Sequence, residues 1–385
     1  MNTKELDKKY IMGTYGRFDI ELSHGKGSTL YDADGKKYID FGSGIAVNTF
    51  GVGDQEWTDA VTAQLGKIQH SSNYYYTEPC AKLAEMLCKR TGMKKVFFSN
   101  SGAEANECAI KAARKYGTDQ DEEKNVIITL KNSFHGRTIT TLSATGQEVF
   151  HKNFTPFTPG FVYVEAGNAD ELRETFAKYK VAAIMMELIQ GEGGVIPLDC
   201  DFVRLAAKLA EENDALVVID EIQTGNGRTG TLYAYEQFGI SPDIVTTAKG
   251  LAGGLPIGAT MFAEKVENIL TPGTHGSTFG GNPVSAAGAV NILSRIDEKL
   301  LENVSENSKY IFEKISAMSG VENVCGMGYM IGIKTKRSAK DIALSCLENG
   351  LLVLTAKDKV RLLPALNITR EEIDAGLEIL EKALA

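Results

Sequence analysis

The sequence lacks any segment suited to crossing a membrane, and its first residues do not resemble a secretory signal. No apolar run approaches the roughly 18 residues that a membrane span requires. Met1 to Tyr10 is polar and charged and contains no apolar stretch. We therefore expect a cytoplasmic protein that has no membrane partner.

Cysteine is scarce, and its spacing excludes the usual metal-binding patterns. The six cysteines form no Cys-x-x-Cys pair and no cluster with histidine. This pattern favours free thiols in a reducing compartment, and it predicts no metal site. The cysteines are Cys80, Cys88, Cys108, Cys200, Cys325 and Cys346.

Positive charge is in deficit, because the formal net charge is -9 at pH 7. An acidic chain is repelled by phosphate backbones, so we expect no nucleic-acid partner. The sequence also has no Walker loop, HExxH or GxSxG motif. These absences remove the most recognisable signatures of nucleotide hydrolases, metalloproteases and serine hydrolases.

Length and glycine content indicate what the chain does contain. Its 385 residues exceed what one compact core usually holds, so we expect a large domain and a smaller one. Its 39 glycines are more frequent than the usual share of about 7%. They cluster in short loops, a pattern that indicates backbone built for close approach to a ligand.

Short apolar runs alternate with helical patterns through the middle of the chain. Continuous apolar strands separated by helices indicate a mostly parallel sheet covered on both faces, which is an α/β architecture. Ligands of such sheets bind beyond the carboxyl ends of the strands. The predicted strands are residues 95–98, 126–130, 161–164, 181–186, 215–219, 243–248 and 257–262, and the predicted helices are residues 103–116, 170–179 and 201–213.

The two ends of the chain differ from this middle part. Asp34-Gly35 predicts a hairpin turn, while the Asp32-x-Asp34 spacing lacks the further ligands of a calcium loop. We predict an N-terminal segment (1–45) packed with the small domain, a large domain (46–280) and a small α+β domain (281–385). The last has a helical stretch over 283–319, strands near 329–334, 351–354 and 360–363, and a final helix capped by Thr369 and Glu372.

Ser101 and Glu104 begin the predicted helix that follows the first apolar strand. Ser101 caps the helix and Glu104 completes a capping box. Gly102 lets an anion approach the free backbone N–H groups at the helix N-terminus. The pattern fits a phosphate site, and it equally fits an ordinary helix start.

Asp220 and Lys249 end two consecutive predicted strands. A buried carboxylate is costly unless it meets a cation or hydrogen-bond donors, and a protonated pyridine nitrogen is such a partner. A buried lysine has a lowered pKa, which favours the free amine that attacks a carbonyl cofactor. Each residue alone has a structural alternative, a backbone-bonded acid or a lysine in solvent. Their arrangement together indicates one site.

The loop after residues 126–130 offers Phe134, His135 and Arg137. Phe134 is suited to stacking on a planar ring, and Arg137 is suited to holding a carboxylate bidentately. A lone loop histidine is more often a structural donor than an acid–base catalyst, so His135 receives no predicted role.

Gly225-x-Gly227-x-x-Gly230 matches the dinucleotide-binding fingerprint. Five residues separate Ile219 from the first glycine, Arg228 lies inside the motif, and no clear helix follows. A dinucleotide-dependent oxidoreductase therefore stands only as a weaker alternative hypothesis.

At these residues the chain resembles the class III (ornithine-type) aminotransferases of fold type I. The resemblance extends over nearly the whole chain. It departs at Gly51-Val-Gly-Asp-Gln55, where the family usually has Gly-His and His-Pro, which puts substrate detail and subunit contacts in doubt. The matching motifs are Tyr15-Gly-Arg17, Gly44-Ile-Ala-Val-Asn48, Ser101-Gly-Ala-Glu-Ala-Asn106, Phe134-His-Gly-Arg-Thr138, Glu187-x-x-Gln190-Gly-Glu192, Asp220-Glu-Ile-Gln223, Thr224-Gly-x-Gly-Arg-Thr-Gly230, Lys249, His275-Gly-Ser-Thr278 and Arg361-Leu-Leu-Pro364.

The resemblance implies a pyridoxal 5'-phosphate (PLP) transferase whose large domain carries a mostly parallel seven-stranded sheet. It implies that Lys249 binds the cofactor covalently and that Asp220 pairs with the ring nitrogen. The other implied cofactor contacts are Gly102, Ala103, Phe134, Gln223 and, from the other subunit, Thr278. The implied substrate contacts are Arg137, Ser277 across the interface, and Arg361 on the α-carboxylate of glutamate with Glu192 as its counter-charge.

The implied activity moves the terminal amino group of N-acetylornithine to 2-oxoglutarate, a step of arginine biosynthesis, in a homodimer. Ornithine, succinylornithine and 4-aminobutyrate are alternative donors, because the class shares one catalytic set. A non-catalytic relative that only binds ligands is a further alternative, which the presence of Lys249, Asp220 and Arg137 disfavours.

Overall fold

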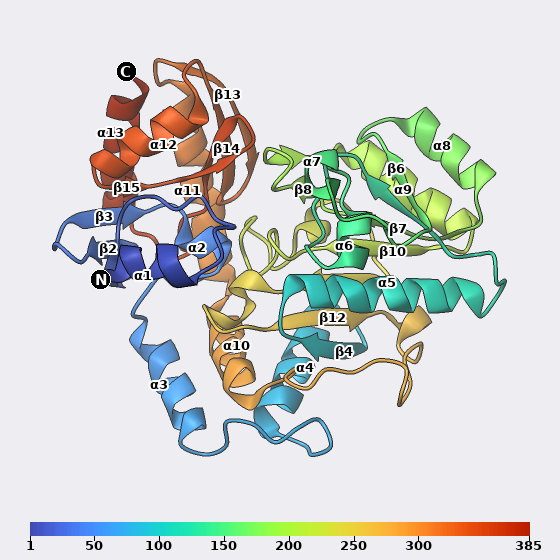
Figure 1. Cartoon of the computed structure of the whole chain (residues 1–385). Helices are drawn as coiled ribbons and strands as arrows, with labels where there is room; N and C mark the ends of the chain where they lie inside the picture. The colour runs from blue at the N-terminus through green and yellow to red at the C-terminus, as the bar shows by residue number, and fades with distance from the viewer.

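The computed structural model describes residues 1–385 and forms two lobes (Figure 1). The larger lobe is built on one seven-stranded sheet. β12 alone runs antiparallel to its neighbours, and the other strands are parallel to one another. The predicted α/β fold with a mostly parallel sheet is confirmed. The spatial order is β4 (Lys95–Ser99), β12 (Gly258–Phe262), β11 (Ile244–Thr247), β10 (Leu216–Asp220), β7 (Val181–Met186), β5 (Val126–Leu130) and β6 (Phe161–Val164).

Helices cover both faces of this sheet. α5 (Gly102–Thr118) lies across one face (Figure 1) and packs small side chains against it. The opposite face shares a larger core with α9 (Cys200–Glu212) and α10 (Pro283–Arg295). Because alternate residues of a strand point to opposite faces, the adjacent Val217 and Val218 enter different cores. The polar groups that follow the central strands are therefore held by a fully covered scaffold.

The smaller lobe contains a second, antiparallel sheet with its own hydrophobic core. Helices pack on this sheet and share that core with it. The strands, in spatial order, are β13 (Val321–Met327), β14 (Met330–Thr335), β17 (Lys359–Leu362) and β16 (Leu354–Ala356), and the helices are α11 (Glu298–Ser316), α12 (Ala339–Glu348) and α13 (Arg370–Leu384).

The first strands of the chain join the C-terminal part of the molecule. β1 (Leu22–Lys26), β2 (Thr29–Asp32) and β3 (Lys37–Asp40) form a meander, and β3 pairs in parallel with β15 (Leu351–Leu352). The predicted hairpin is present. Asp32 uses its Oδ1 within the turn, accepting from the backbone N–H groups of the residues two and four positions later.

Two expectations for the C-terminal part are wrong. The stretch expected as one helix over 283–319 is two helices, because Asp297 caps α11 by accepting from the Leu300 N–H at 2.8 Å. The strand expected over 351–354 is divided between two sheets, since β15 pairs with β3 while β16 pairs with β17. The first error overlooked a local capping residue, whereas the second arises because the partners of both strands are distant in the sequence.

The domain boundaries at 45/46 and 280/281 remain our proposal. α10 follows the second boundary in sequence, yet it packs against α3 and α4 in the core of the large sheet. None of the helices combines the length and apolar composition that a membrane crossing needs. The remaining α-helices of eight or more residues are α1 (Thr3–Tyr10), α3 (Gln55–Leu65), α4 (Glu78–Thr91) and α8 (Ala169–Lys178).

Candidate active site

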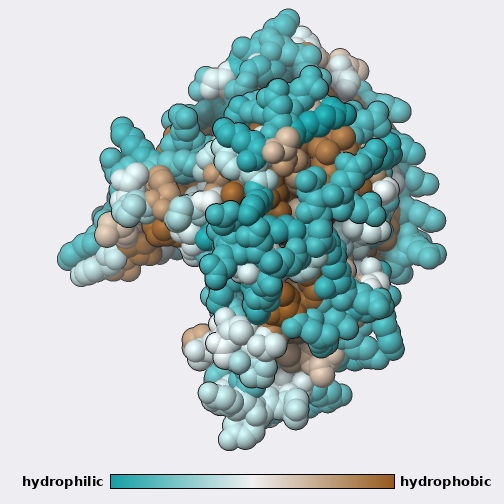
Figure 2. Space-filling model, turned by 90° about the vertical axis from the view of Figure 1, so that its right-hand side faces the viewer, coloured by the Kyte–Doolittle hydropathy of each residue, from teal (hydrophilic) through white to brown (hydrophobic).

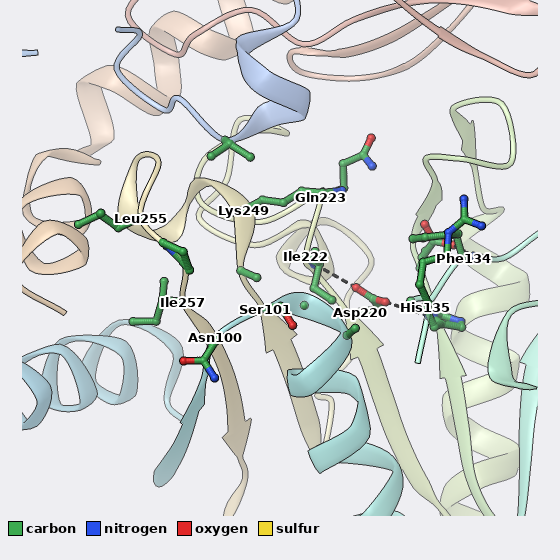
Figure 3. Close-up of a pocket in the computed structure, with 18 of the residues that line it drawn as sticks. Asn100, Ser101, Phe134, His135, Asp220, Ile222, Gln223, Lys249, Leu255 and Ile257 are labelled. Atoms are coloured by element: carbon green, nitrogen blue, oxygen red, sulfur yellow. Dashed lines mark hydrogen bonds and ion pairs between the residues drawn. The ribbon is translucent and has the colours of Figure 1, made fainter. Parts of the chain in front are cut away.

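A cavity of about 400 Å³ lies at the carboxyl ends of the central strands, which is the sheet edge where we expected the chemistry. Figure 3 shows side chains from several loops converging on it. Its lining joins most of the residues singled out from the sequence. They include Asn100, Ser101, Gly102, Ala103, Phe134, His135, Arg137, Glu187, Asp220, Gln223 and Lys249.

Lys249 follows β11 and starts a short 3-10 helix (Lys249–Ala252). Its φ of 41° places the residue in the left-handed region, which L-residues rarely adopt and which functional sites often contain. Burial lowers its pKa to about 8, with Glu192 opposing this shift and Arg361 adding to it. The free amine is thus far easier to form than in an ordinary lysine, although the ammonium still predominates at pH 7.

Asp220 ends β10, the strand beside β11, in parallel register with Thr246. Its carboxylate is buried and held by donors on both oxygens. Oδ2 accepts from Asn106 Nδ2 at 2.7 Å and lies 2.8 Å from His135 Nδ1, while Oδ1 accepts from the Ile222 N–H at 3.1 Å. Three donors fix the acid in one orientation at the cavity.

His135 is a residue of the site whose function the sequence did not reveal. Its ring is fully buried, and the Nδ1 contact with Asp220 requires the hydrogen on Nδ1. Nε2 then has no partner within the chain. The sequence did indicate that the buried carboxylate of Asp220 needs hydrogen-bond donors. Only the fold could identify His135 and Asn106 as the ones that supply them.

The start of α5 presents free backbone N–H groups to the cavity. Ser101 Oγ accepts from the Glu104 N–H at 3.2 Å, as predicted. The second half of the predicted capping box is wrong, because Glu104 Oε2 accepts from the backbone N–H of Asn100 and the hydroxyl of Ser101, not from the backbone N–H of Ser101. A Cβ at Gly102 would lie 2.7 Å from Ile222, so only glycine fits this approach.

Glu187 joins two loops of the cavity, and the sequence gave no role for it. Its Oε1 accepts from the Phe134 N–H at 2.8 Å, and its Oε2 accepts from the Gly191 N–H at 3.2 Å. Burial raises its pKa to about 7, although the charge of His135 opposes the shift. Glu187 therefore fixes the backbone under the Phe134 ring relative to the loop that leads to Glu192.

Glu192 and Arg361 form an ion pair between the two lobes. Glu192 Oε1 accepts from Arg361 Nη1 at 2.6 Å, and the same nitrogen donates to Gln223 Oε1 at 3.2 Å. Burial would raise the pKa of Glu192, but the charge and hydrogen bond of Arg361 hold it below its usual value. The sequence predicted Arg361 with Glu192 as counter-charge, and the structure places the two in contact.

Ser277 and Thr278 do not line the Lys249 cavity of their own chain. They lie in a neighbouring hollow together with Asn100, Glu104 and His275. Ser277 Oγ accepts from Asn100 Nδ2 at 3.2 Å and from the Gly280 N–H at 2.9 Å. This position accords with the expectation that both residues serve the site of another subunit, which stays a prediction.

The glycine-rich segment Gly225–Gly230 packs between the lobes instead of opening a helix. A Cβ at Gly227 would lie 2.9 Å from Leu366 of the smaller lobe. Arg228 is buried, and its Nη1 donates to the carbonyl of Pro364. The segment contributes no residue to the cavity, which removes the basis for the dinucleotide hypothesis.

Comparison with known proteins places this geometry in a family. The sequence model of the family described as aminotransferase class-III matches residues 11–384. The acetylornithine aminotransferase of Haemophilus ducreyi is 48% identical over 99% of this chain and 98% of that protein. That of Clostridium acetobutylicum is 44% identical over 98% of this chain and all of that protein.

Solved structures agree with the sequence matches. An N-acetylornithine aminotransferase from Stenotrophomonas maltophilia is 36% identical, with a TM-score of 0.85 and coverage of 98% of this chain and 97% of that one. An ornithine aminotransferase from Toxoplasma gondii, whose structure has PLP at partial occupancy in the active site, is 31% identical, with a TM-score of 0.94 and coverage of 99% and 93%.

The chain therefore belongs to the class-III aminotransferases, and its fold is that of their PLP-dependent structures. The enzyme is a transaminase. Within the class, the curated relatives described above are both acetylornithine aminotransferases.

Proposed function

We propose that the enzyme transfers the terminal amino group of N-acetylornithine to 2-oxoglutarate, giving N-acetylglutamate 5-semialdehyde and glutamate. The observation that carries the proposal is the placement of Lys249 and Asp220 at the ends of adjacent strands in one cavity. The identity of 44–48% to two acetylornithine aminotransferases supports this donor. The reaction belongs to arginine biosynthesis, and we place the enzyme in the cytoplasm.

The residues of the cavity fit PLP. The close approach at Gly102 leaves the N–H groups of Gly102 and Ala103 free for a phosphate. Asp220, fixed by its donors, would pair with a pyridinium nitrogen. Gln223 and Phe134 also line the cavity and would contact the ring hydroxyl and the ring face. The cofactor, when bound, supplies a reactive carbonyl and an electron-withdrawing ring.

Lys249 has two functions in this proposal. Its amine, with a pKa of about 8, is nucleophilic enough near neutral pH to bind a carbonyl group. After the substrate takes its place, the same amine removes the proton from the substrate carbon and returns it on the other side of the transferred nitrogen, a general acid–base role. Lys249 lines the cavity, and its backbone there has a left-handed conformation.

Two substrates of different charge use one pocket. Arg361 holds the α-carboxylate of glutamate or 2-oxoglutarate, and Glu192 pairs with Arg361 when the amine donor is bound. Arg137 holds the carboxylate of the donor, with Ser277 from the partner copy. Because an unpaired buried arginine is costly, a carboxylate that can pair or withdraw suits this alternation.

The decisive experiment is a donor panel with 2-oxoglutarate, comparing kcat/KM for N-acetylornithine, ornithine, succinylornithine and 4-aminobutyrate. The highest kcat/KM is expected for N-acetylornithine, and a higher kcat/KM for another donor overturns the substrate assignment.

Two further measurements test the cofactor site and the oligomeric state. Borohydride reduction followed by peptide mass spectrometry should place the cofactor on Lys249. The same protein should sediment as a homodimer, since Ser277 and Thr278 serve the other copy's site.

A further inference from the structure

Arg137 lies at the mouth of the cavity as an exposed cation. The ion pairs within the site join His135 to Asp220 and Glu192 to Arg361, and Arg137 takes part in neither. Its contacts are aromatic instead. The guanidinium carbon lies 4.1 Å from the ring centroid of Phe150 and 5.5 Å from that of Phe134.

Phe150 belongs to the short helix α7 (Glu148–His151), outside every motif discussed so far. Its ring meets that of Phe134 edge to face, with centroids 5.7 Å apart and planes at 78°. The next residue anchors the segment, because His151 Nε2 donates to the carbonyls of Leu142 and Thr145 at 2.9 and 2.7 Å. The hydrogen bonds of His151 thus fix the segment that carries Phe150.

Stacking determines which parts of a guanidinium remain available. An aromatic ring occupies the flat face of the cation and leaves the N–H groups at its edge free. Those N–H groups match the two oxygens of a carboxylate in one plane. An unstacked arginine on the surface would instead sample many rotamers, and it would lose that conformational freedom when a ligand binds.

We propose that Phe150 is a specificity-determining residue that orients Arg137 for amine donors carrying a carboxylate remote from the reacting amine. The inference rests on the proposed function, because it assigns the donor's carboxylate to Arg137. Phe150 does not touch the reacting atoms. It acts through the orientation of Arg137. Arg137 also contacts Phe134, the residue that we propose faces the cofactor ring.

The test compares ligands with and without the carboxylate. N-acetylputrescine is N-acetylornithine without that group, and N-acetylnorvaline retains the carboxylate but lacks the reactive amine. In Phe150→Leu we expect KM for N-acetylornithine and Kd for N-acetylnorvaline to rise about three- to tenfold, the range of one cation–π contact. The kcat/KM for N-acetylputrescine should change by less than about twofold, because this ligand has no carboxylate for Arg137 to hold.

Three variants make the test specific. Phe150→Tyr keeps an aromatic face and should restore wild-type Kd. Phe154→Leu alters an exposed ring of the same segment that contacts no arginine, and should leave both ligands unaffected. In an Arg137→Ala background, Phe150→Leu should add no further loss, because the partner of the ring is already absent.

The proposal is overturned if Phe150→Leu weakens both kinds of ligand equally, or if its loss persists in the Arg137→Ala background. Wild-type protein that binds N-acetylnorvaline but prefers another donor would overturn the substrate assignment alone. The binding measurement separates these two failures, since it does not depend on turnover.

Discussion

Glu192 Oε1 lies 2.6 Å from Nη1 of Arg361, and the side chain of Arg361 is almost fully buried. Glu192 follows the small strand β8 (Ile189–Gln190), whereas Arg361 is on β17 of the smaller lobe. One ion pair therefore connects the two lobes beside the cavity, which neither residue lines and which Arg361 reaches through its hydrogen bond to Gln223. A substrate that brings its own carboxylate to Arg361 has to displace Glu192.

Replacing Glu192 with alanine should impair the amine half-reaction more than the glutamate half-reaction. Without Glu192, Arg361 keeps an unpaired charge that attracts the donor's carboxylate to the wrong place. Single-turnover rates at subsaturating substrate should fall about tenfold for N-acetylornithine, the loss of one charged hydrogen bond. Glu192→Asp retains the charge, and its rate should lie between those of the wild type and Glu192→Ala. If Glu192→Ala slowed both half-reactions equally, the idea that Glu192 and a substrate carboxylate alternate on Arg361 would be contradicted.

Lys249→Met should stabilise the protein without cofactor at neutral pH while abolishing turnover. The folded pKa is about 8 against an ordinary 10.5, so below pH 8 the folded state carries the full cost of burying the ammonium. Between pH 8 and 10.5 the unfolded chain binds the proton that the folded chain lacks, and stability rises with pH.

The substitution removes this dependence. At pH 7 the free energy of unfolding should increase by up to about 3 kcal/mol, and the gain should shrink toward pH 10.5. Urea unfolding at several pH values measures it, with the exposed Lys67→Met as the control. A gain that is the same at pH 7 and pH 10.5 would show that the desolvated charge is not its cause.

His135→Leu should weaken cofactor binding through Asp220. The variant removes the donor 2.8 Å from Asp220 Oδ2 and leaves only Asn106 on that oxygen. We expect Kd for PLP to rise about tenfold, since a hydrogen bond to a charged group contributes about 1.5–3 kcal/mol. Equilibrium titration followed by absorbance measures the change, and the exposed His24→Leu serves as a control. An unchanged Kd would restrict His135 to packing.

Arg228→Gln should affect the dicarboxylic substrate through the strand that carries Arg361. Arg228 donates to the carbonyl of Pro364, three residues beyond Arg361, and its own carbonyl accepts from the Tyr329 N–H at 2.8 Å. Removing the buried donor should lower stability by about 1–3 kcal/mol. KM for 2-oxoglutarate should rise more than KM for N-acetylornithine. A proportional rise in both would indicate a general loss of folding.

Much of the fold was predictable because its sheet strands are continuous apolar runs. The strand predicted over 181–186 coincides with β7, and that over 126–130 coincides with β5. The first strand of the chain, β13 and α12 were missed. β13 has no fully buried residue, so its stability comes from partners distant in sequence. α12 does have a local signal that was overlooked, the cap Ser338 followed by buried residues at helical spacing, namely Ala339, Ile342, Ala343 and Cys346.

The residues of the site likewise divide into those that the sequence could predict and those that it could not. Lys249 and Asp220 were predictable because each combines a costly charged group with the end of an apolar strand. Glu187, His135 and Phe150 hold other groups of the protein in place: Glu187 holds backbone N–H groups, and the other two contact the side chains of Asp220 and Arg137. Their importance depends on contacts such as that of Glu187 with the Phe134 N–H, which no spacing in the sequence reports.

The parallel pairing of β3 with β15 has a consequence for biosynthesis. During translation β3 is made long before β15, so Ile39 finds its partner Leu351 only after all strands of the large sheet have been synthesised. Until then the hairpin has an open edge that is able to pair with other polypeptides. Truncating the chain before Leu351 should therefore leave β3 without a partner and expose an aggregation-prone edge.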